Sequence, residues 1–225
     1  MRDEKKNING QLRPLAFSLH PSSFPENSPE FSGIEEWAGT SVKFVRVDGL
    51  EAGESLSPAE ALRYAAFRME KRRSEWLAGR LAAKTLLARP EGKKLSAFEI
   101  TTDRLGRPSC AGALLSISHS NGWAMAAGKP GSDFLGADLE KIEERHPAWY
   151  RDYFHLPELP RPDPSEATRI WAVKEALLKA LGLGLMADPM DIRTDGKVAF
   201  TGKALERYKE LGSPPFSVET RPLPE

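Results

Sequence analysis

Apolar positions recur along this chain with two different spacings, which predicts a fold built from both helices and strands. Alternating apolar and polar residues, and short apolar runs between turn residues, predict strands. These strands are expected at residues 42–47, 98–102, 114–118, 123–127, 134–140, 190–193, 197–201 and 216–220. Helical spacing predicts helices from Ser57 towards Met69, over residues 76–88, from Pro164 to Leu181 and over residues 204–211.

The boundaries of the predicted helix from Pro164 to Leu181 are marked by their own residues. Asp163 is a suitable N-cap, Pro164 suits the first turn, and Glu166 follows three residues after the cap. Gly182 can take the left-handed conformation that often ends a helix. Residues 155–165 contain several prolines, which forbid a continuous helix across the preceding stretch.

The chain divides by composition into a polar beginning and a longer structured part. Residues 1–39 are rich in Ser, Pro and Glu with few aromatic residues, so they are expected to form a loosely ordered extension. In the remainder, helices and strands follow in a similar order on both sides of residues 129–132. No residue-level repeat relates the two parts.

Composition and charge exclude several classes of protein. With 225 residues, 40% of them hydrophobic, the chain is long enough for one compact unit or two small lobes. The 32 basic and 32 acidic residues give a formal net charge of zero, which does not favour bulk binding of nucleic acid. The single cysteine, Cys110, excludes an internal disulfide framework. No apolar run approaches the ~18 residues of a membrane helix, and no export signal is recognised, so a cytoplasmic location is expected.

Charged residues interrupt the otherwise apolar helix that ends at Gly182. Trp171, Glu175 and Lys179 are spaced four residues apart, so they fall on one stripe of that helix. An acid and a base would therefore face the same place, which is a candidate reaction centre. The alternative is an ordinary surface ion pair, worth ~0.2–0.5 kcal/mol.

Two further carboxylates are expected on a single strand. Asp138 and Glu140 alternate with apolar residues between Phe134 and Glu140, so both should project from the same face. Adjacent carboxylates repel one another unless a cation joins them, and magnesium prefers oxygen ligands. Glu175 is the third candidate ligand. The alternative is that these carboxylates simply lie on a solvated strand face.

A polar turn follows the predicted strand at residues 114–118. Ser118, His119 and Ser120 precede the Asn121-Gly122 pair, which favours a tight turn into the next strand. Hydroxyls, backbone N–H groups and an imidazole together could bind phosphate. Alternatively, the serines satisfy the turn and the histidine packs or points to solvent.

Basic residues gather in one region although the whole chain is neutral. Between residues 71 and 94 the only acidic residues are Glu75 and Glu91. The basic residues of this region are Lys71, Arg72, Arg73, Arg80, Lys84, Arg89, Lys93 and Lys94. This local excess suggests a ligand that carries phosphate, although a basic helix can also be a solvated face.

Five segments in this order resemble the 4'-phosphopantetheinyl transferases of the surfactin-synthetase type. The resemblance covers roughly residues 42–200. It rests on Arg72-Arg73-x-x-Trp76-Leu77-Ala78-Gly79-Arg80, on Gly106-Arg107-Pro108, on Ser118-His119-Ser120, on Gly136-x-Asp138-x-Glu140, and on Trp171-x-x-Lys174-Glu175-Ala176-x-x-Lys179-Ala180. Departures are Arg107 and Trp76, where Lys and Phe are commoner in the family, and a short, proline-rich stretch before the last motif.

The resemblance implies a reaction in which the phosphopantetheine arm of coenzyme A is transferred to a serine of an apo acyl or peptidyl carrier protein, releasing adenosine 3',5'-bisphosphate. Asp138, Glu140 and Glu175 would hold Mg²⁺ on the pyrophosphate. Glu175 would take the proton from the attacking serine, directly or through a water molecule, and Lys179 would bind, stabilise or protonate the leaving phosphate. The other contacts with coenzyme A are assigned to Lys174 for the pyrophosphate, to Ser118 and His119 for its phosphates, and to Arg73, Arg80 and Arg107 for the nucleotide, with Arg72 as the alternative to Arg73.

The resemblance also implies an α+β fold of two pseudo-symmetric lobes, each a small, mostly antiparallel sheet packed with helices. The lobes would span residues 40–131 and 132–225, with the ligand cleft between them and the metal and catalytic residues in the second. A monomer is expected. Two other functions stay open: a binding module that recognises carriers or coenzyme A without transfer, and a magnesium-dependent phosphohydrolase that uses water as its nucleophile.

Overall fold

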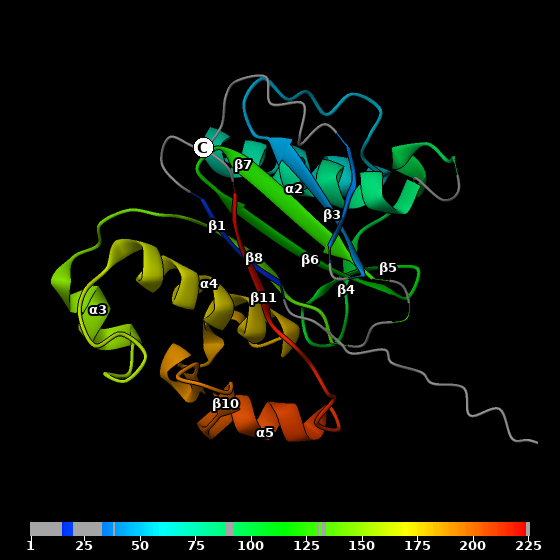
Figure 1. Ribbon diagram of the computed structural model, residues 1–225. Coiled ribbons are helices and arrows are strands. Elements are labelled where there is room, and N and C mark those ends of the chain that lie inside the picture. Colours follow the sequence, from blue (N-terminus) through cyan, green and yellow to red (C-terminus); the bar gives the residue numbers. More distant parts are fainter. Residues whose placement is uncertain are drawn as a thin grey trace, which may run out of the picture.

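The computed structural model of this chain describes residues 15–19, 33–37, 39–88, 92–129, 131 and 134–223. Most strands belong to one antiparallel sheet of six strands in the order β2-β3-β7-β6-β5-β4 (Figure 1). They are β2 (Glu35–Trp37), β3 (Thr40–Arg46), β4 (Thr101–Thr102), β5 (Pro108–Cys110), β6 (Ala113–Ser120) and β7 (Trp123–Gly128). Strands β6 and β7 form the predicted hairpin, because Asn121 and Gly122 both have positive φ, 48° and 75°.

Two helices lie on the N-terminal part of the chain, α1 (Pro58–Ala65) and α2 (Glu70–Ala88). Helix α1 starts at a complete capping box between Ser57 and Glu60. Helix α2 packs across β3, β6 and β7 and covers one face of the sheet (Figure 1). Gly79 allows this close approach, since a Cβ there would lie 2.7 Å from Cγ2 of Ile117 on β6.

A second sheet has three strands, in the order β11-β1-β8, that pair in parallel. They are β1 (Leu15–Leu19), β8 (Ala137–Lys141) and β11 (Glu219–Leu223). The antiparallel pair β9 (Ile192–Arg193) and β10 (Ala199–Phe200) lies apart from it. Single turns of 3-10 helix occupy η2 (Leu95–Ala97), η3 (Gly184–Met186) and η4 (Pro189–Asp191).

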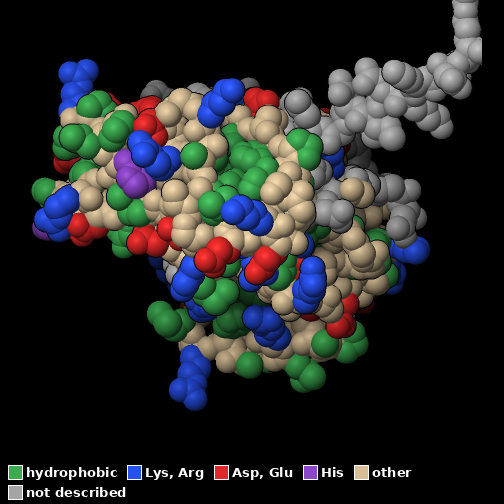
Figure 2. All heavy atoms as spheres, turned by 90° about the horizontal axis from the view of Figure 1, so that it is seen from below, with side chains coloured by type: hydrophobic (Ala, Val, Ile, Leu, Met, Phe, Trp, Pro, Cys, Tyr) green, Lys and Arg blue, Asp and Glu red, His purple; other side chains and the backbone are tan. Residues whose placement is uncertain are grey.

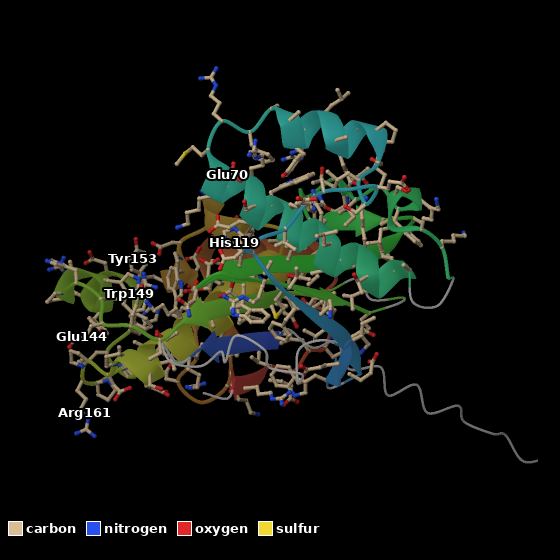
Figure 3. All side chains as sticks on the ribbon, turned by 90° about the horizontal axis from the view of Figure 1, so that it is seen from above. Glu70, His119, Glu144, Trp149, Tyr153 and Arg161 are labelled. Atoms are coloured by element: carbon tan, nitrogen blue, oxygen red, sulfur yellow. The ribbon has the colours of Figure 1, made fainter. Side chains whose placement is uncertain are left out.

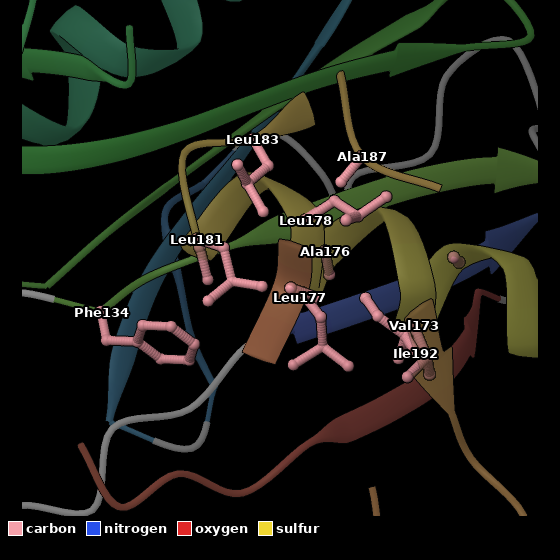
Figure 4. Packing of buried hydrophobic residues seen from close by; sticks show 12 residues of the cluster. Phe134, Val173, Ala176, Leu177, Leu178, Leu181, Leu183, Ala187 and Ile192 are labelled. Carbon is pink, nitrogen blue, oxygen red and sulfur yellow. The ribbon is translucent and has the colours of Figure 1, made fainter. Parts of the chain in front are cut away.

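Three helices belong to the C-terminal part, α3 (Pro147–Tyr153), α4 (Pro164–Ala180) and α5 (Gly202–Glu210). Helix α4 packs on β1 and β8 with one face. Its apolar residues, among them Leu177 and Leu178, form the largest core with Phe134, Leu181 and Ile192 (Figure 4). The predicted signals of α4 are confirmed: Asp163 accepts from the backbone N–H of Glu166 at 2.7 Å, and Gly182 has φ +68°.

The α+β class, with an antiparallel sheet packed with helices, is confirmed. Several predicted boundaries differ, however. The strand expected at 134–140 begins at Ala137, because Gly136 is pressed against the backbone of α4. The strand expected at 98–102 is reduced to β4, since a turn of 3-10 helix precedes it. Within the extension expected at 1–39, residues 15–19 and 35–37 form strands, and residues 1–14 and 20–32 lie outside the described residues.

Charges of both signs are mixed over the face shown in Figure 2, which agrees with the formal net charge of zero. Among the described residues, no helix combines the length and the apolar character that crossing a membrane would need.

Candidate active site

The structure brings the predicted acidic residues and Lys179 together where α4 crosses β8. Asp138 and Glu140 alternate along β8, and Glu175 and Lys179 lie one turn apart on α4. Asp138 is buried, and its Oδ1 accepts from Nζ of Lys179 at 2.6 Å. Nζ of Lys179 also lies 3.4 Å from the carbonyl oxygen of Ala137. The predicted stripe of α4 therefore faces the predicted acidic strand.

Helix α4 can reach β8 because Gly136 has no side chain. A Cβ at Gly136 would lie 1.8 Å from the carbonyl oxygen of Ala176 and 2.7 Å from the backbone nitrogen of Ala180. Any larger residue would push the strand away from the helix. The glycine that precedes Asp138 thus sets the separation between the carboxylates of β8 and Glu175.

Two of the three carboxylates, Glu140 and Glu175, have raised pKa values. Burial raises the pKa of Glu140 to about 7, helped by the charges of Asp138 and Glu175 and opposed by Arg145 and Lys179. Burial and the nearby Asp138 also raise the pKa of Glu175, against the effect of Lys179. Burial is the larger cause for both groups, and the charge of Asp138 adds to it.

Two carboxylate oxygens of this cluster have no hydrogen-bond partner. They are Oδ2 of Asp138 and Oε1 of Glu175, and both atoms are buried. Buried oxygens without a donor are costly unless a ligand satisfies them, so the donor set suits a hard divalent cation. Within the part of the chain that the structure describes, however, no three Asp, Glu, His or Cys side chains are drawn together closely enough to enclose an ion.

Ser118 lies beneath the acidic cluster and not in a phosphate-binding pocket. It is 7% exposed, and its hydroxyl donates to Oδ1 of Asp138 at 2.8 Å. Its neighbour His119 points to the other side of β6, is half exposed, and lies 3.8 Å from Glu75 on α2. Figure 3 shows His119 on the side of the molecule where α2 begins, near Glu70. Only His119 of this pair is therefore open to a ligand.

Lys179 and Arg107 border a pocket of about 260 Å³. Its wall is largely apolar and includes Leu115, Ile117 and Leu183. Arg107 is fixed by donating to Oδ2 of Asp103 at 2.8 Å and to the carbonyl oxygen of Ala180 at 3.1 Å. The turn that carries Arg107 is thus attached to the end of α4.

A second pocket, of about 240 Å³, is lined by cations and an aromatic ring. Arg63, Arg72 and Arg80 line it together with Trp76 and His119. The guanidinium of Arg80 lies 4.9 Å from the centre of the Trp76 ring. Both pockets include Pro108 and Ile117 in their walls, so they adjoin one another.

A buried carboxylate holds two cations below this second pocket. Glu60 is 4% exposed and forms ion pairs with Nζ of Lys84 and, at 3.7 Å, with Nε of Arg80. Glu60 also accepts from the backbone N–H groups of Ser57 and Ile100, at 3.0 and 3.2 Å. Arg80, predicted from the sequence, is therefore fixed from behind by a residue that no site motif indicated.

Of the two neighbouring arginines considered in the sequence, Arg72 lines the pocket. Arg73 instead pairs with Glu70 and lies 5.6 Å from the ring of Tyr64. Arg63 and Trp76, which also line the pocket, were not assigned from the sequence. No sequence motif includes Arg63, whereas Trp76 belongs to the motif from Arg72 to Arg80.

Lys174 is the predicted site residue that the structure does not bring to the site. Its side chain is fully buried, and Nζ donates to Oε2 of Glu158 at 2.8 Å and to the carbonyl oxygen of Tyr153 at 2.9 Å. Adjacent helical residues are turned by ~100° from one another, so Lys174 faces the segment after α3 while Glu175 faces β8. In this placement Nζ of Lys174 contacts Glu158 and Tyr153 and not the acidic cluster, so its contact with pyrophosphate stays a prediction.

An aromatic group borders the acidic cluster on the side of α3. Trp149 and Tyr153 of α3 lie 5.6 and 5.1 Å, between ring centres, from Trp171 of α4 (Figure 3). Arg145 lies 5.5 Å from the ring centre of Trp149 and 3.6 Å from Oε2 of Glu140. No motif marked Arg145, and only the aromatic run at residues 149–154 could have drawn attention to this region.

Comparison with known proteins supports the resemblance seen in the sequence. A family model of the 4'-phosphopantetheinyl transferase superfamily matches residues 134–211, and one of the 4'-phosphopantetheinyl transferase N-terminal domain matches residues 59–128. A curated phosphopantetheinyl transferase of Thraustochytrium sp. is 27% identical over 183 residues. That match covers 68% of this chain and 62% of the relative, so the chain spans less than two thirds of the relative's length.

Among solved structures, a Chronobacterium ammoiniagenes apo-ACPS structure matches with 23% identity and a TM-score of 0.32, covering 40% of this chain and 92% of that chain. The two family models include the acidic strand β8, helix α4 and the whole of the basic helix α2. The chain belongs to the 4'-phosphopantetheinyl transferase superfamily.

Proposed function

We propose that this chain transfers the 4'-phosphopantetheine arm of coenzyme A to a serine of an apo acyl or peptidyl carrier protein. The serine oxygen would bond to the phosphorus that bears the pantetheine, and the bond from that phosphorus to the bridging oxygen would break. Adenosine 3',5'-bisphosphate would leave. The observation that carries this proposal is the group of buried and half-buried carboxylates beside Lys179, with two buried oxygens lacking partners, at the edge of a pocket.

Asp138, Glu140 and Glu175 would hold the metal. When bound, Mg²⁺ would neutralise charge on the phosphate oxygens. Glu175 would accept the proton of the carrier serine, and its raised pKa brings its basicity closer to neutral pH. Lys179, which is 25% exposed and borders the pocket, would stabilise or protonate the leaving phosphate.

The two adjoining pockets would receive coenzyme A. The pocket of Arg63, Arg72, Arg80, Trp76 and His119 supplies guanidinium groups for a phosphate and a ring on which a base can stack. The pocket bordered by Arg107 and Lys179 would take the pantetheine end of coenzyme A. In this arrangement coenzyme A would lie between residues 40–131 and residues 132–225. One chain would supply both pockets.

Intact-mass spectrometry of apo carrier proteins tests this proposal directly. Several apo acyl and peptidyl carriers are incubated with the protein, coenzyme A and Mg²⁺, with a matched sample lacking Mg²⁺. We expect a Mg²⁺-dependent gain of one phosphopantetheine arm on at least one carrier. Release of phosphopantetheine without any carrier would instead identify a phosphohydrolase, and binding of coenzyme A without transfer would identify a binding module.

A further inference from the structure

Three serines on one side of β6 bond to the neighbouring strand β8. Ser116, Ser118 and Ser120 are spaced two residues apart, so their side chains project from the same face of the strand. The hydroxyl of Ser116 accepts from the backbone N–H of Ala137 at 2.8 Å, and that of Ser120 accepts from the N–H of Lys141 at 3.1 Å. The middle serine, Ser118, donates to the side chain of Asp138.

These contacts join two sheets that share no strand pairing. Strand β6 belongs to the antiparallel sheet and β8 to the parallel one, yet the two strands pack against each other. Because the bonded positions rise together along both strands, β6 and β8 run in the same direction. Serine hydroxyls thus replace a backbone ladder here, and they fix β8, with its two carboxylates, against the first part of the molecule.

Ser118 and Lys179 determine which oxygen of Asp138 stays available. Both donate to Oδ1, at 2.8 and 2.6 Å, whereas Oδ2 is buried without a partner. A carboxylate with one oxygen held from two directions has little freedom to rotate. Lys179 can move to a ligand, because its ammonium is partly exposed, but the hydroxyl of Ser118 is buried.

We propose that Ser118 is a positioning residue that holds Oδ1 of Asp138 so that Oδ2 is presented to the divalent cation. Ser116 and Ser120 fasten the same two strands without touching a carboxylate. This inference rests on the proposed function, since it concerns the metal site of that function. In this role Ser118 would contact Asp138, whereas the sequence led us to expect a contact with a phosphate of coenzyme A.

Binding of Mn²⁺ in the presence of coenzyme A, followed by the electron paramagnetic resonance signal of free Mn²⁺, tests the proposal without any turnover. We expect Ser118→Ala to raise the Kd for Mn²⁺ by ~10- to 100-fold, the usual effect of losing a partner of a metal ligand. Ser118→Thr keeps the hydroxyl and should stay within about threefold of the wild type. Ser120→Ala is the matched control and should lower the Tm while leaving the Kd unchanged.

Two outcomes would overturn the role of Ser118 alone: a wild-type Kd in Ser118→Ala, or an equal loss in Ser120→Ala. Failure of the wild type to bind Mn²⁺ would overturn the metal site of the proposed function as well. If Ser118→Ala does not fold, Ser118→Cys has nearly the same shape but is only a weak donor. It should also weaken Mn²⁺ binding, and a wild-type Kd in that variant would contradict the proposal.

Discussion

At the scale of single residues, Lys179 occupies the point where the acidic cluster meets a pocket. Its ammonium group satisfies Asp138 in the free protein and lies beside the proposed place of the leaving phosphate. A charge that interacts with a leaving group contributes more in the transition state than in the ground state. Substituting Lys179 should therefore affect the chemical step more than binding.

We predict that Lys179→Met lowers kcat by ~10²- to 10³-fold, the range seen when one stabilising donor is removed, and changes KM for coenzyme A less than about tenfold. The measurement is steady-state kinetics with an apo carrier that the wild type is found to modify. Lys209→Met, on exposed α5, is the matched control and should retain wild-type kinetics. A loss of kcat below tenfold would remove Lys179 from the chemical step.

Glu140 should make stability depend on pH in the absence of divalent ions. Its folded pKa, about 7, lies above the usual 4.5, so the protonated form is favoured in the folded protein. The stabilisation that protonated Glu140 contributes to the folded protein is therefore complete below pH ~4.5, and it is lost as the pH rises through about 7. We predict that the free energy of unfolding of the wild type, relative to Glu140→Gln, falls by roughly 2 kcal/mol from pH 5 to pH 8. Urea denaturation in the presence of a chelator measures this free energy at each pH. A difference between the two proteins that does not change with pH would contradict the raised pKa of Glu140.

The sequence identified which residue types form the acidic cluster, but not where every side chain of its motifs points. Asp138, Glu140, Glu175 and Lys179 could be predicted to meet because strand and helix periodicity determine the faces they share. Lys174 shares a motif with Glu175 and Lys179, yet it is buried beside Glu158. Ser118 belongs to the Ser118-His119-Ser120 motif, yet its hydroxyl lies under Asp138. Those placements depend on packing partners distant in sequence.

At the scale of elements, the contact between β8 and α4 brings the carboxylates of the site together. We predict that Gly136→Ala destabilises the protein by ~3 kcal/mol or more, because the added Cβ would overlap the backbone of α4. The free energy of unfolding in urea is the measurement. Gly33→Ala is the control, since a Cβ at Gly33 meets nothing within 4 Å and its φ is not left-handed. Similar stability of the two variants would show that β8 and α4 separate easily.

Element boundaries were predicted well where a local signal marks them. The capping residues of α1 and α4 and the Asn121-Gly122 turn act within a few residues, so the sequence contains them. The start of β8 is different. The strand begins only after Gly136, where the backbone of α4 approaches closely, and no local signal marks that approach. Short strands such as β4 and β9 depend on neighbours more than on their own residues.

At the scale of the whole molecule, the proposed binding region spans two pockets from distant parts of the chain. Arg72 lines the pocket of α2, remote in sequence from the proposed catalytic residues of β8 and α4. We predict that Arg72→Ala raises KM for coenzyme A by ~10-fold and leaves kcat nearly unchanged, since the lost contact acts in ground and transition states alike.

Dephospho-coenzyme A, which lacks the 3'-phosphate, shows what Arg72 contacts. With this substrate the wild type and Arg72→Ala should have similar KM values. Arg68→Ala, an exposed arginine outside the pocket, should behave as the wild type with both substrates. An equal increase of KM for both substrates would place Arg72 away from the 3'-phosphate.

The α+β class followed from the sequence because each element carries its own periodicity, whereas the pairing of the strands did not. The parallel order β11-β1-β8 joins the beginning, the middle and the end of the described chain. Such pairings depend on contacts between residues distant in sequence, about which local pattern says little. The expectation of mostly antiparallel pairing came from the resemblance and describes the six-stranded sheet.

The buried group of Glu60, Lys84 and Arg80 has a thermodynamic consequence for the protein without ligand. Two cations face one carboxylate there, and burial lowers the pKa of Arg80 because its charge is poorly solvated. In the free protein two buried cations therefore share one buried carboxylate next to a pocket. By linkage, an anion that binds only the folded state shifts the folding equilibrium towards it. In the proposed function a phosphate of coenzyme A would supply a further counter-ion there, so the protein would be more stable in the complex than alone.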